Sequence, residues 1–175
     1  MLRRTLNAIA TLSLCLVATQ ITAQKAQAKE LTNRLGVGYA NQFSTDLPSL
    51  AVRYYPDPKM SVGAQLGVDT QKDSSKFGFS VNVHRVIFTE DNVNFYMGSS
   101  AGLISTQSIP TGQTSSKTDS GFELAAFIGA EFFFTGLENL GFSFEGGVGV
   151  TSVSSQVRFR TIGDTPFKAG VIFYF

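Results

Sequence analysis

The sequence is short of charged residues, of tryptophan and of long apolar runs, and each shortage excludes a class of protein. Charged residues make up only 15% of the 175 residues and tryptophan is absent, whereas phenylalanine occurs 16 times and glycine 17 times. The surface of a soluble enzyme normally carries more lysine and glutamate than this. After residue 23 no unbroken apolar run approaches the roughly 20 residues that a membrane-spanning helix needs. The apolar residues, 43% of a chain that suits a single domain, must therefore follow another pattern.

Cysteine and histidine are also scarce, which excludes several kinds of chemistry. Cys15 and His84 are the single residues of their types, so neither a disulfide nor a zinc site of clustered cysteine and histidine is expected. The glycine-rich residues 146–149 lack the spacing of a dinucleotide-binding loop. Beyond residue 28, 14 − 3 = 11 basic residues stand against 13 acidic ones, a balance that gives no sign of a nucleic-acid partner. We predict no catalytic residue, no metal site and no cofactor.

Residues 1–28 have the pattern of a cleaved signal peptide. Arg3 and Arg4 form a basic start, residues 9–18 form an apolar core, and the Ala-Gln-Ala of residues 26–28 places small side chains where a signal peptidase reads them. We expect cleavage directly after that tripeptide. A membrane anchor is the alternative interpretation, but the apolar core is too short to span a bilayer. Lipidation of the cysteine in this core is not expected, because leucine precedes it where a lipoprotein site needs small residues.

Residues 29–175 are dominated by an alternation of apolar and polar side chains, which is the period of β-strands. The alternation predicts eight strands, over residues 34–42, 49–55, 61–69, 77–84, 93–103, 122–132, 140–150 and 167–175. Short turns at 57–59, 89–91 and 135–139 separate longer connections at 43–48, 70–76, 105–120 and 152–165, an arrangement typical of outer-membrane barrels. Weak alternation from Val153 to Ile162 leaves the limit of the last connection open, with a strand extending beyond the membrane as one interpretation. We predict an all-β domain, an eight-stranded antiparallel up-and-down transmembrane barrel.

The apolar faces of these strands are expected to point toward lipid. A soluble barrel of the lipocalin type would instead turn its apolar face inward. The opposite face, however, consists mainly of glycine, serine and alanine, which suit the crowded interior of an eight-stranded barrel better than a solvated surface. Aromatic residues also gather beside the short turns, which predicts an interfacial girdle. The predicted girdle comprises Tyr54, Tyr55, Phe88, Phe95, Phe132, Phe133, Phe134, Phe142, Tyr174 and Phe175.

The inward face carries chargeable side chains of both signs. Unpaired charges in a narrow lumen would cost much free energy, so we expect ion pairs and hydrogen-bonded networks. Two interpretations stay open: a gate or narrow conduit, and a packed polar core that plugs the barrel, which we favour. The predicted lumenal network comprises Arg34, Arg53, Asp69, His84, Glu123, Glu131, Glu145 and Lys168.

The last nine residues, Phe-Lys-Ala-Gly-Val-Ile-Phe-Tyr-Phe, carry a resemblance to a known family. With the barrel pattern, they make residues 29–175 resemble the small OmpA/OmpX-like outer-membrane barrels of Gram-negative bacteria. The resemblance implies location in the cell outer membrane, contact with its lipid and lipopolysaccharide, and a monomer. It also implies that the barrel-assembly machinery reads Val171, Phe173 and Phe175 during biogenesis. Alternatively, Phe175 is only the last lipid-facing residue, and both interpretations are compatible.

Enzymatic activity is the least favoured function. His84 is followed by Arg85 rather than by the serine of the lipid-A deacylase pattern, and alternation places this histidine in the lumen, where a lipid acyl chain would not reach it. A nucleophile, base and acid set built on His84 with Ser80 lacks support from the sequence. A hydrogen-bonding role in the lumen is expected instead, and a lipid-modifying enzyme is kept only as a third hypothesis.

The leading hypothesis is a non-enzymatic protein with a structural or surface-interaction role, in envelope integrity or adhesion. Function in such barrels lies in loops on a rigid scaffold, so loop 105–120 is the expected contact site for a surface ligand. The alternative hypothesis is a narrow channel or transporter for small solutes. Arg158 and Arg160, around Phe159 in the last connection, are a candidate contact for lipopolysaccharide phosphates, although a solvated loop face or a strand extension is the favoured interpretation.

Overall fold

The computed structural model describes residues 30–43, 45, 47–72, 74–109, 115–161 and 168–175, so the predicted signal peptide lies outside the described residues. The described residues form nine β-strands: β1 (Leu35–Asn41), β2 (Pro48–Asp57), β3 (Met60–Thr70), β4 (Ser74–Glu90), β5 (Val93–Ser108), β6 (Lys117–Phe134), β7 (Leu137–Val153), β8 (Gln156–Thr161) and β9 (Lys168–Tyr174). No helix in this part of the chain is long and apolar enough to cross a membrane.

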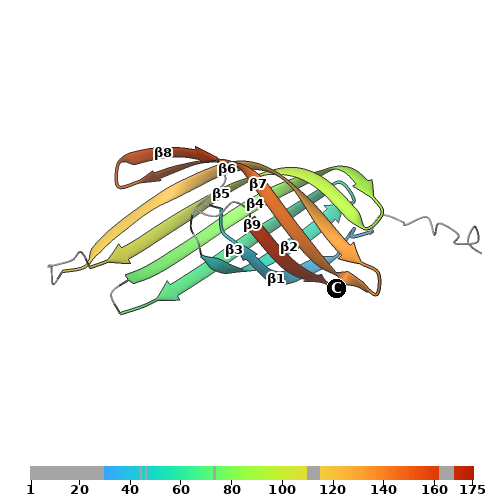
Figure 1. The fold of residues 1–175 in the computed structure, drawn as a ribbon, viewed down its shortest axis with the longest axis horizontal. Coiled ribbons are helices and arrows are strands. Elements are labelled where there is room, and N and C mark those ends of the chain that lie inside the picture. Colours follow the sequence, from blue (N-terminus) through green and yellow to red (C-terminus); the bar gives the residue numbers. More distant parts are fainter. Residues whose placement is uncertain (1–29, 44, 46, 73, 110–114, 162–167) are drawn as a thin grey trace, which may run out of the picture.

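The strands close into one antiparallel barrel of eight walls (Figure 1). Strands β1 to β7 each pair with the next, and β9 pairs with both β1 and β7. The eighth wall has two parts, because β8 pairs with Val148–Val153 of β7 and β9 pairs with Leu140–Glu145 of the same strand. The pairing of the last strand with the first closes the sheet, as the predicted up-and-down barrel requires. We call the β1–β9 junction the seam.

The pairing register fixes the tilt of the strands. Successive partners lead from Tyr39 through β2 to β6 and reach Ser152 on β7. The other neighbour of Tyr39 is Val171 on β9, which pairs with Phe142 of β7. The two routes around the barrel from Tyr39 therefore reach β7 at positions that are 152 − 142 = 10 residues apart. For eight strands about 4.8 Å apart, that offset corresponds to a tilt of about 40° from the barrel axis.

Apolar side chains cover the outside of the barrel and polar ones fill the inside. The outward residues Leu50 and Ile128 are 66% and 67% exposed, whereas the inward residues Ser61 and Glu131 are fully buried. The alternation that predicted the strands thus also predicted their two faces correctly. Among the described strands, β1 to β7 and β9 each pair on both sides, so the closed part of the barrel leaves no unpaired sheet edge, which is what a hydrocarbon environment requires; β8 at the loop end pairs with β7 alone.

The two ends of the barrel differ. The tight turns at residues 58–59, 91–92 and 135–136 lie at one end, which we call the turn end. At the opposite loop end, the walls are unequal, since β4 to β7 have 16 to 18 residues each and β1 and β9 have seven. The long strands rise beyond the short ones as a tall wall that continues into β8 (Figure 1).

Several predicted boundaries and one predicted group need correction. The predicted loop 105–120 contains the ends of β5 and β6, which pair from Ser105↔Ser120 to Ser108↔Lys117, because cross-strand hydrogen bonds extend the hairpin past its apolar part. The predicted loop 152–165 contains β8, so the weak alternation there does mark a strand. Three predicted girdle residues point inward and are at most 3% exposed: Tyr55, Phe133 and Tyr174.

The closure at the seam gives a first testable prediction. Tyr39 and Val171 are directly paired and both point outward, and such partners have the Cα separation that a disulfide needs. A double variant with cysteine at both positions should therefore form a disulfide on oxidation of the folded protein, detected by mobility on a non-reducing gel. The predicted mature chain, residues 29–175, has no other cysteine. A matched pair at Tyr39 and Ile128 should not react, and a seam pair that never crosslinks would contradict closure.

Candidate functional site

The centre of the lumen holds a buried arginine between two buried carboxylates. Arg53 lies on β2, Glu131 on β6 and Glu145 on β7, and alternation on each strand directs these side chains inward. The Nη1 atom of Arg53 lies 3.3 Å from Glu131 Oε1, and its Nη2 atom lies 3.4 Å from Glu145 Oε1. All three side chains are at most 4% exposed. Because isolated charges cannot be buried at acceptable cost, each group here depends on the others.

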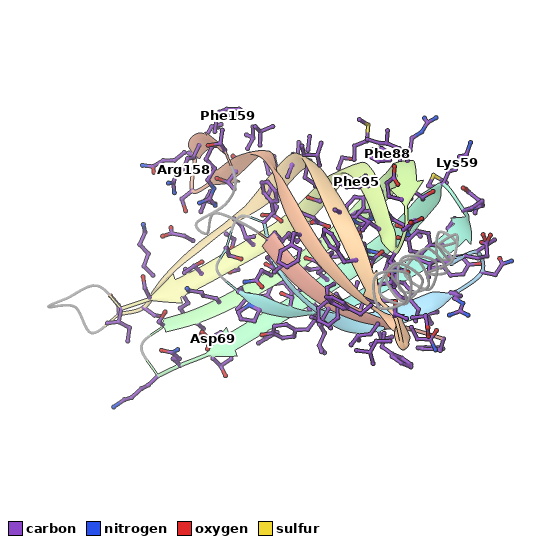
Figure 2. The ribbon with its side chains drawn as sticks, turned by 45° about the vertical axis from the view of Figure 1, so that its right-hand side comes forward. Lys59, Asp69, Phe88, Phe95, Arg158 and Phe159 are labelled. Carbon is purple, nitrogen blue, oxygen red and sulfur yellow. The ribbon has the colours of Figure 1, made fainter. Side chains whose placement is uncertain are left out.

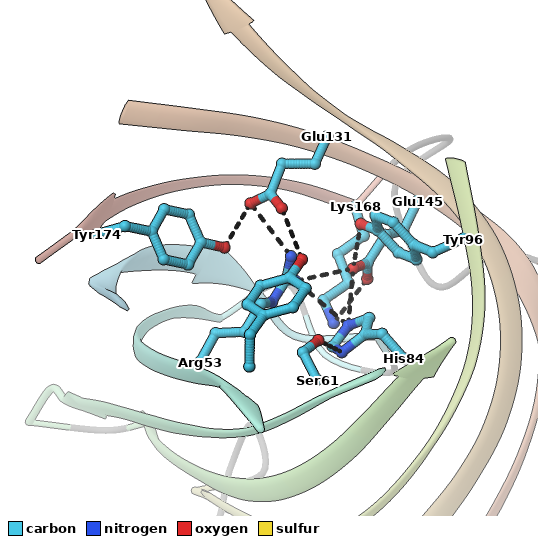
Figure 3. Close-up of polar contacts among 9 residues, drawn as sticks. Arg53, Ser61, His84, Tyr96, Glu131, Glu145, Lys168 and Tyr174 are labelled. Atoms are coloured by element: carbon cyan, nitrogen blue, oxygen red, sulfur yellow. Dashed lines mark hydrogen bonds and ion pairs between the residues drawn. The ribbon is translucent and has the colours of Figure 1, made fainter. Parts of the chain in front are cut away.

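Three tyrosines complete the hydrogen bonding of the carboxylates (Figure 3). The hydroxyls of Tyr55 and Tyr174 donate to Glu131 at 2.9 and 2.6 Å. The hydroxyl of Tyr96 donates to Glu145 at 2.8 Å. Hydrogen bonds to a charged acceptor are shorter and stronger than neutral ones, so the tyrosines stabilise the ionised carboxylates. Sequence reasoning did not include these tyrosines in the network, although the alternation places all three on the inward face.

A second cation balances the second carboxylate. The Nζ atom of Lys168 lies 3.1 Å from Glu145 Oε2 and 5.5 Å from the centre of the Phe127 ring. His84 lies on the other side, with its Nε2 atom 3.4 Å from Glu145 Oε1 and 3.2 Å from Arg53 Nη2. The arginine and the lysine thus match the two carboxylates in charge. With His84 and the three tyrosines they form one cluster to which six strands contribute: β2, β4, β5, β6, β7 and β9. We call the cluster of Arg53, His84, Glu131, Glu145, Lys168 and their tyrosine partners the lumenal network.

The network is covered toward the loop end by the connection between β1 and β2. Gln42, Phe43 and Leu47 turn inward from this connection and are 2–4% exposed. The Phe43 ring lies 6.4 Å from the Phe127 ring, centre to centre, above the network. The backbone N–H of Gln42 donates to the carbonyl of Leu47, which holds the connection folded over. This apolar cover, the upper plug, closes the lumen on that side.

A second apolar cluster closes the lumen at the turn end. Leu31, Val86 and Phe133 pack there against the rings of Tyr55 and Tyr174, whose hydroxyls belong to the lumenal network, and all five residues are at most 8% exposed. Leu31 precedes β1 and is held there by backbone hydrogen bonds, from the N–H of residue 34 to its own carbonyl and from the N–H of residue 33 to the carbonyl of Tyr55. We call this cluster the lower plug. The charged network therefore lies between two apolar plugs.

One part of the network has the connectivity of a catalytic triad. The Oγ atom of Ser61 lies 3.2 Å from His84 Nδ1, and the opposite nitrogen of His84 lies 3.4 Å from Glu145. A nucleophile must meet its substrate, however, and Ser61 is fully buried beneath the plugs. Arg53 also contacts both His84 and Glu145, so the carboxylate is committed to structural ion pairs. Among the described residues no group of three or more His, Cys, Asp or Glu side chains is placed to hold a metal ion.

The predicted network is thus assembled in part. Five of the eight predicted residues meet: Arg53, His84, Glu131, Glu145 and Lys168. Glu123 is buried in the lumen nearer the loop end, where its Oε2 atom has no hydrogen-bond partner among the described residues. Arg34 donates to Asn139 at the turn end, and Asp69 accepts from Gln71 at the loop end. Arg34 directly precedes β1 and Asp69 is the last residue but one of β3, so the two lie at opposite rims and are corrections to the predicted network.

The loop end carries a polar pocket of about 350 Å³ on the inner side of the tall wall. Lys117, Asp119, Arg158 and Arg160 line it. Lys117 Nζ lies 3.2 Å from Asp119, and the hydroxyl of Ser154 also donates to this carboxylate. The serine hydrogen bond and then the lysine hold the pKa of Asp119 below its usual value, so one stable anion lines the pocket together with three cations.

The two predicted lipopolysaccharide contacts belong to this pocket. Arg158 pairs with Thr151, whose side chain is buried, so Arg158 points to the inner side of the wall. The next residue, Phe159, points outward and is 67% exposed, and Figure 2 shows both at the loop end. The β8 hairpin thus has a basic inner face and an apolar outer face.

The C-terminal residues Val171, Phe173 and Phe175 all point outward, with exposed fractions of 39%, 51% and 65%. They form one apolar row on β9 and just beyond it, beside the seam. The row is therefore accessible from outside the barrel, as recognition during assembly would require.

Comparison with known proteins identifies the fold. The chain is similar to the N-terminal β-barrel domain of OprF from Pseudomonas aeruginosa, with a TM-score of 0.52 and 15% sequence identity, over 82% of this chain and 98% of that domain. The sequence matches no known family profile and no curated protein. At this identity the likeness concerns the fold, and it confirms the predicted OmpA-like barrel of eight antiparallel strands. The closed sheet and its apolar outer surface are those of a bacterial outer-membrane barrel.

Proposed function

We propose that this outer-membrane barrel is a non-conducting scaffold with a structural and surface-interaction role. The observation that carries the proposal is the sealed lumen, in which charged groups lie between two apolar plugs. Ions would have to displace both plugs and break buried ion pairs to pass, which costs several kcal/mol. In this arrangement the loop end, with its long connections, faces the cell exterior, and the turn end faces the periplasm.

The burial of Ser61 and His84 supports a non-enzymatic role. Both side chains are at most 1% exposed, and the apolar outer surface that contacts lipid is separated from them by the sheet itself. Neither a lipid nor a soluble substrate has a path to the hydroxyl in this state. The network therefore serves to hold the barrel together.

Interaction with other molecules is assigned to the tall wall and to loop 105–120. The wall raises the ends of β5, β6, β7 and β8 above the rest of the rim, so these parts meet a surface ligand first. Arg158 and Arg160 supply charge for lipopolysaccharide phosphates, while Phe159 supplies an apolar contact for the acyl region beside them. The outward row that ends at Phe175 supports recognition by the barrel-assembly machinery.

The sealed lumen predicts that the protein does not conduct in a planar lipid bilayer. Folded wild-type protein should give no stepwise openings at moderate voltage, because both plugs remain closed. The variants Arg53→Met and Glu90→Gln test the cause of any current, since the first alters the network and the second an exposed turn residue. Openings of the wild type that Arg53→Met abolishes and Glu90→Gln leaves unchanged would contradict the proposal.

Those openings would instead support the second candidate, a narrow channel for small solutes. One observation favours that candidate: Arg53 contacts both carboxylates at once, at 3.3 and 3.4 Å, so an ion pair with one would remain if the other were broken. Membrane location is tested separately by cell fractionation with heat-modifiable gel mobility. Recovery in the soluble periplasm without a mobility shift would contradict it.

A further inference from the structure

An open apolar groove lies on the outside of the barrel, where β4 to β7 face the membrane. Its volume is about 520 Å³. Its floor is made of small residues, Ser99 on β5 and Ala126 on β6, and larger apolar side chains border it: Val83, Met97, Ile128 and Val148. All of these residues point outward, so the groove is a depression in the surface that contacts lipid.

A cation stands at one edge of this groove. Arg85 pairs with Met97, and both side chains point outward. In the described middle parts of β3 to β7, the other outward side chains are apolar or small, and Arg85 is the charged exception. A charged side chain facing hydrocarbon costs free energy unless it reaches the interface and meets an anion. The Arg85 guanidinium therefore needs an anionic partner, and the described outward residues around the groove do not supply one.

The position of Arg85 suits the periplasmic interface. Arg85 lies two residues closer to the membrane centre than Ile87. At the strand tilt found here, this separation is about 5 Å along the membrane normal. The stacked rings of Phe88 and Phe95, 4.5 Å apart, mark the interface on the same strands, and Figure 2 shows them at the turn end with Lys59. The carbonyl of Lys59 accepts from the N–H of Val86, so this exposed lysine adjoins the same segment.

The groove rises from Arg85 toward the middle of the membrane. The paired row Arg85, Met97, Ile128, Gly146 crosses three strand intervals, and each interval climbs toward the loop end because of the strand tilt. The total climb is about 9 Å. Cationic groups therefore lie at headgroup depth and the apolar depression lies at acyl-chain depth directly above them.

We propose that Arg85 and the groove form a binding site for one anionic phospholipid of the periplasmic leaflet. The lipid phosphate binds the Arg85 guanidinium, and one acyl chain lies over Ser99 and Ala126. The charge and depth of Arg85 select a lipid over a second copy of this chain, because the outward residues around the groove offer no carboxylate to pair with it. The site rests on the membrane location proposed above and is independent of whether the lumen conducts.

Nondenaturing mass spectrometry of the folded protein tests the site. The probes are phosphatidylglycerol and phosphatidylcholine with identical palmitoyl and oleoyl chains. Wild-type protein should bind one phosphatidylglycerol about tenfold more tightly than phosphatidylcholine, as a charge-assisted contact in an apolar setting predicts. Arg85→Leu should remove this preference, and Ala126→Phe should weaken binding of phosphatidylglycerol about tenfold by filling the floor of the groove.

Two matched variants control for charge and bulk. Lys72→Leu removes an exposed cation at the loop end, and Ala64→Phe adds a ring to an outward position on β3 away from the groove; both should bind as the wild type does. Equal binding of the two lipids, or wild-type binding by Arg85→Leu and Ala126→Phe, would overturn the site. So would a protein dimer that Ala126→Phe dissociates, since a second copy would then occupy the groove. Heat-modifiable mobility is scored on every sample, and its loss in the wild type would contradict the membrane barrel itself rather than the lipid site alone.

Discussion

Replacement of Glu131 by glutamine is expected to lower the free energy of unfolding by about 3–5 kcal/mol, the cost of breaking a buried charge pair. Glu131 accepts from Arg53 and from the hydroxyls of Tyr55 and Tyr174, and its side chain is fully buried. Glutamine has nearly the size of glutamate but no charge. Its NH2 group would also point its hydrogens at one of the groups that donate to Glu131. The measurement is urea unfolding in lipid vesicles, followed by circular dichroism because the chain has no tryptophan.

The control for this loss is Glu90→Gln, an exposed carboxylate at the turn end that should change stability by less than about 0.5 kcal/mol. The double variant Arg53→Met with Glu131→Gln removes a charge of each sign. It should lose less stability than the sum of the two single variants, because neither partner is then left alone. Losses that simply add would show that Arg53 and Glu131 do not depend on each other.

Replacement of Gly38 by valine should prevent closure of the barrel or destabilise it by about 3 kcal/mol or more, at the upper end of overpacking costs. Gly38 lies on β1 and pairs with Ile172 across the seam. A Cβ atom at Gly38 would lie 2.7 Å from the Cα atom of Ile172 and would also overlap the carbonyl of Val171. These are backbone atoms held by the strand pairing, so no side-chain rotation relieves the overlap.

The measurement for Gly38→Val is the fraction of protein that migrates as the folded form without heating. This fraction should fall sharply, and the yield of the disulfide between cysteines introduced at Tyr39 and Val171 should fall with it. Ala64→Val places the same side chain at an outward position and should fold like the wild type. A fully folded Gly38→Val variant with an intact seam crosslink would show that the two strands are not so closely packed.

The alternation of side chains predicted the barrel and the direction of most side chains, including His84, because a period of two has a direct meaning in a strand. The same period places Tyr55 with Arg53 and Tyr174 with Lys168, on the inward face. The girdle prediction assigned both tyrosines to the membrane surface because they lie near short turns, and the structure places them in the network. Periodicity was therefore the better guide than aromatic clustering.

The two plugs could not be predicted in the same way. Residues 42–47 have no repeating pattern in the sequence, and the burial of Gln42, Phe43 and Leu47 depends on space provided by other strands. At Gly67, for example, a side chain would overlap Leu47, so the upper plug fits only because β3 has a glycine there. Leu31 similarly depends on a pocket formed by β2, β4, β6 and β9. Such contacts join residues far apart in the sequence and become visible only once the barrel has closed.

The seam has a consequence for the order in which the protein assembles. Tyr39 and Val171 are 132 residues apart in the chain. Every other junction joins strands that are consecutive in the sequence or, for β7 and β9, strands separated by β8 alone. Closing so long a loop is slow, and until the seam closes the free edges of β1 and β9 are costly in hydrocarbon. Lys168 and Tyr174 arrive on that same last strand, so the charges of the interior are balanced in the step that shuts the wall. Insertion should therefore be all-or-none, with no stable half-built barrel for a chaperone to hold in the membrane.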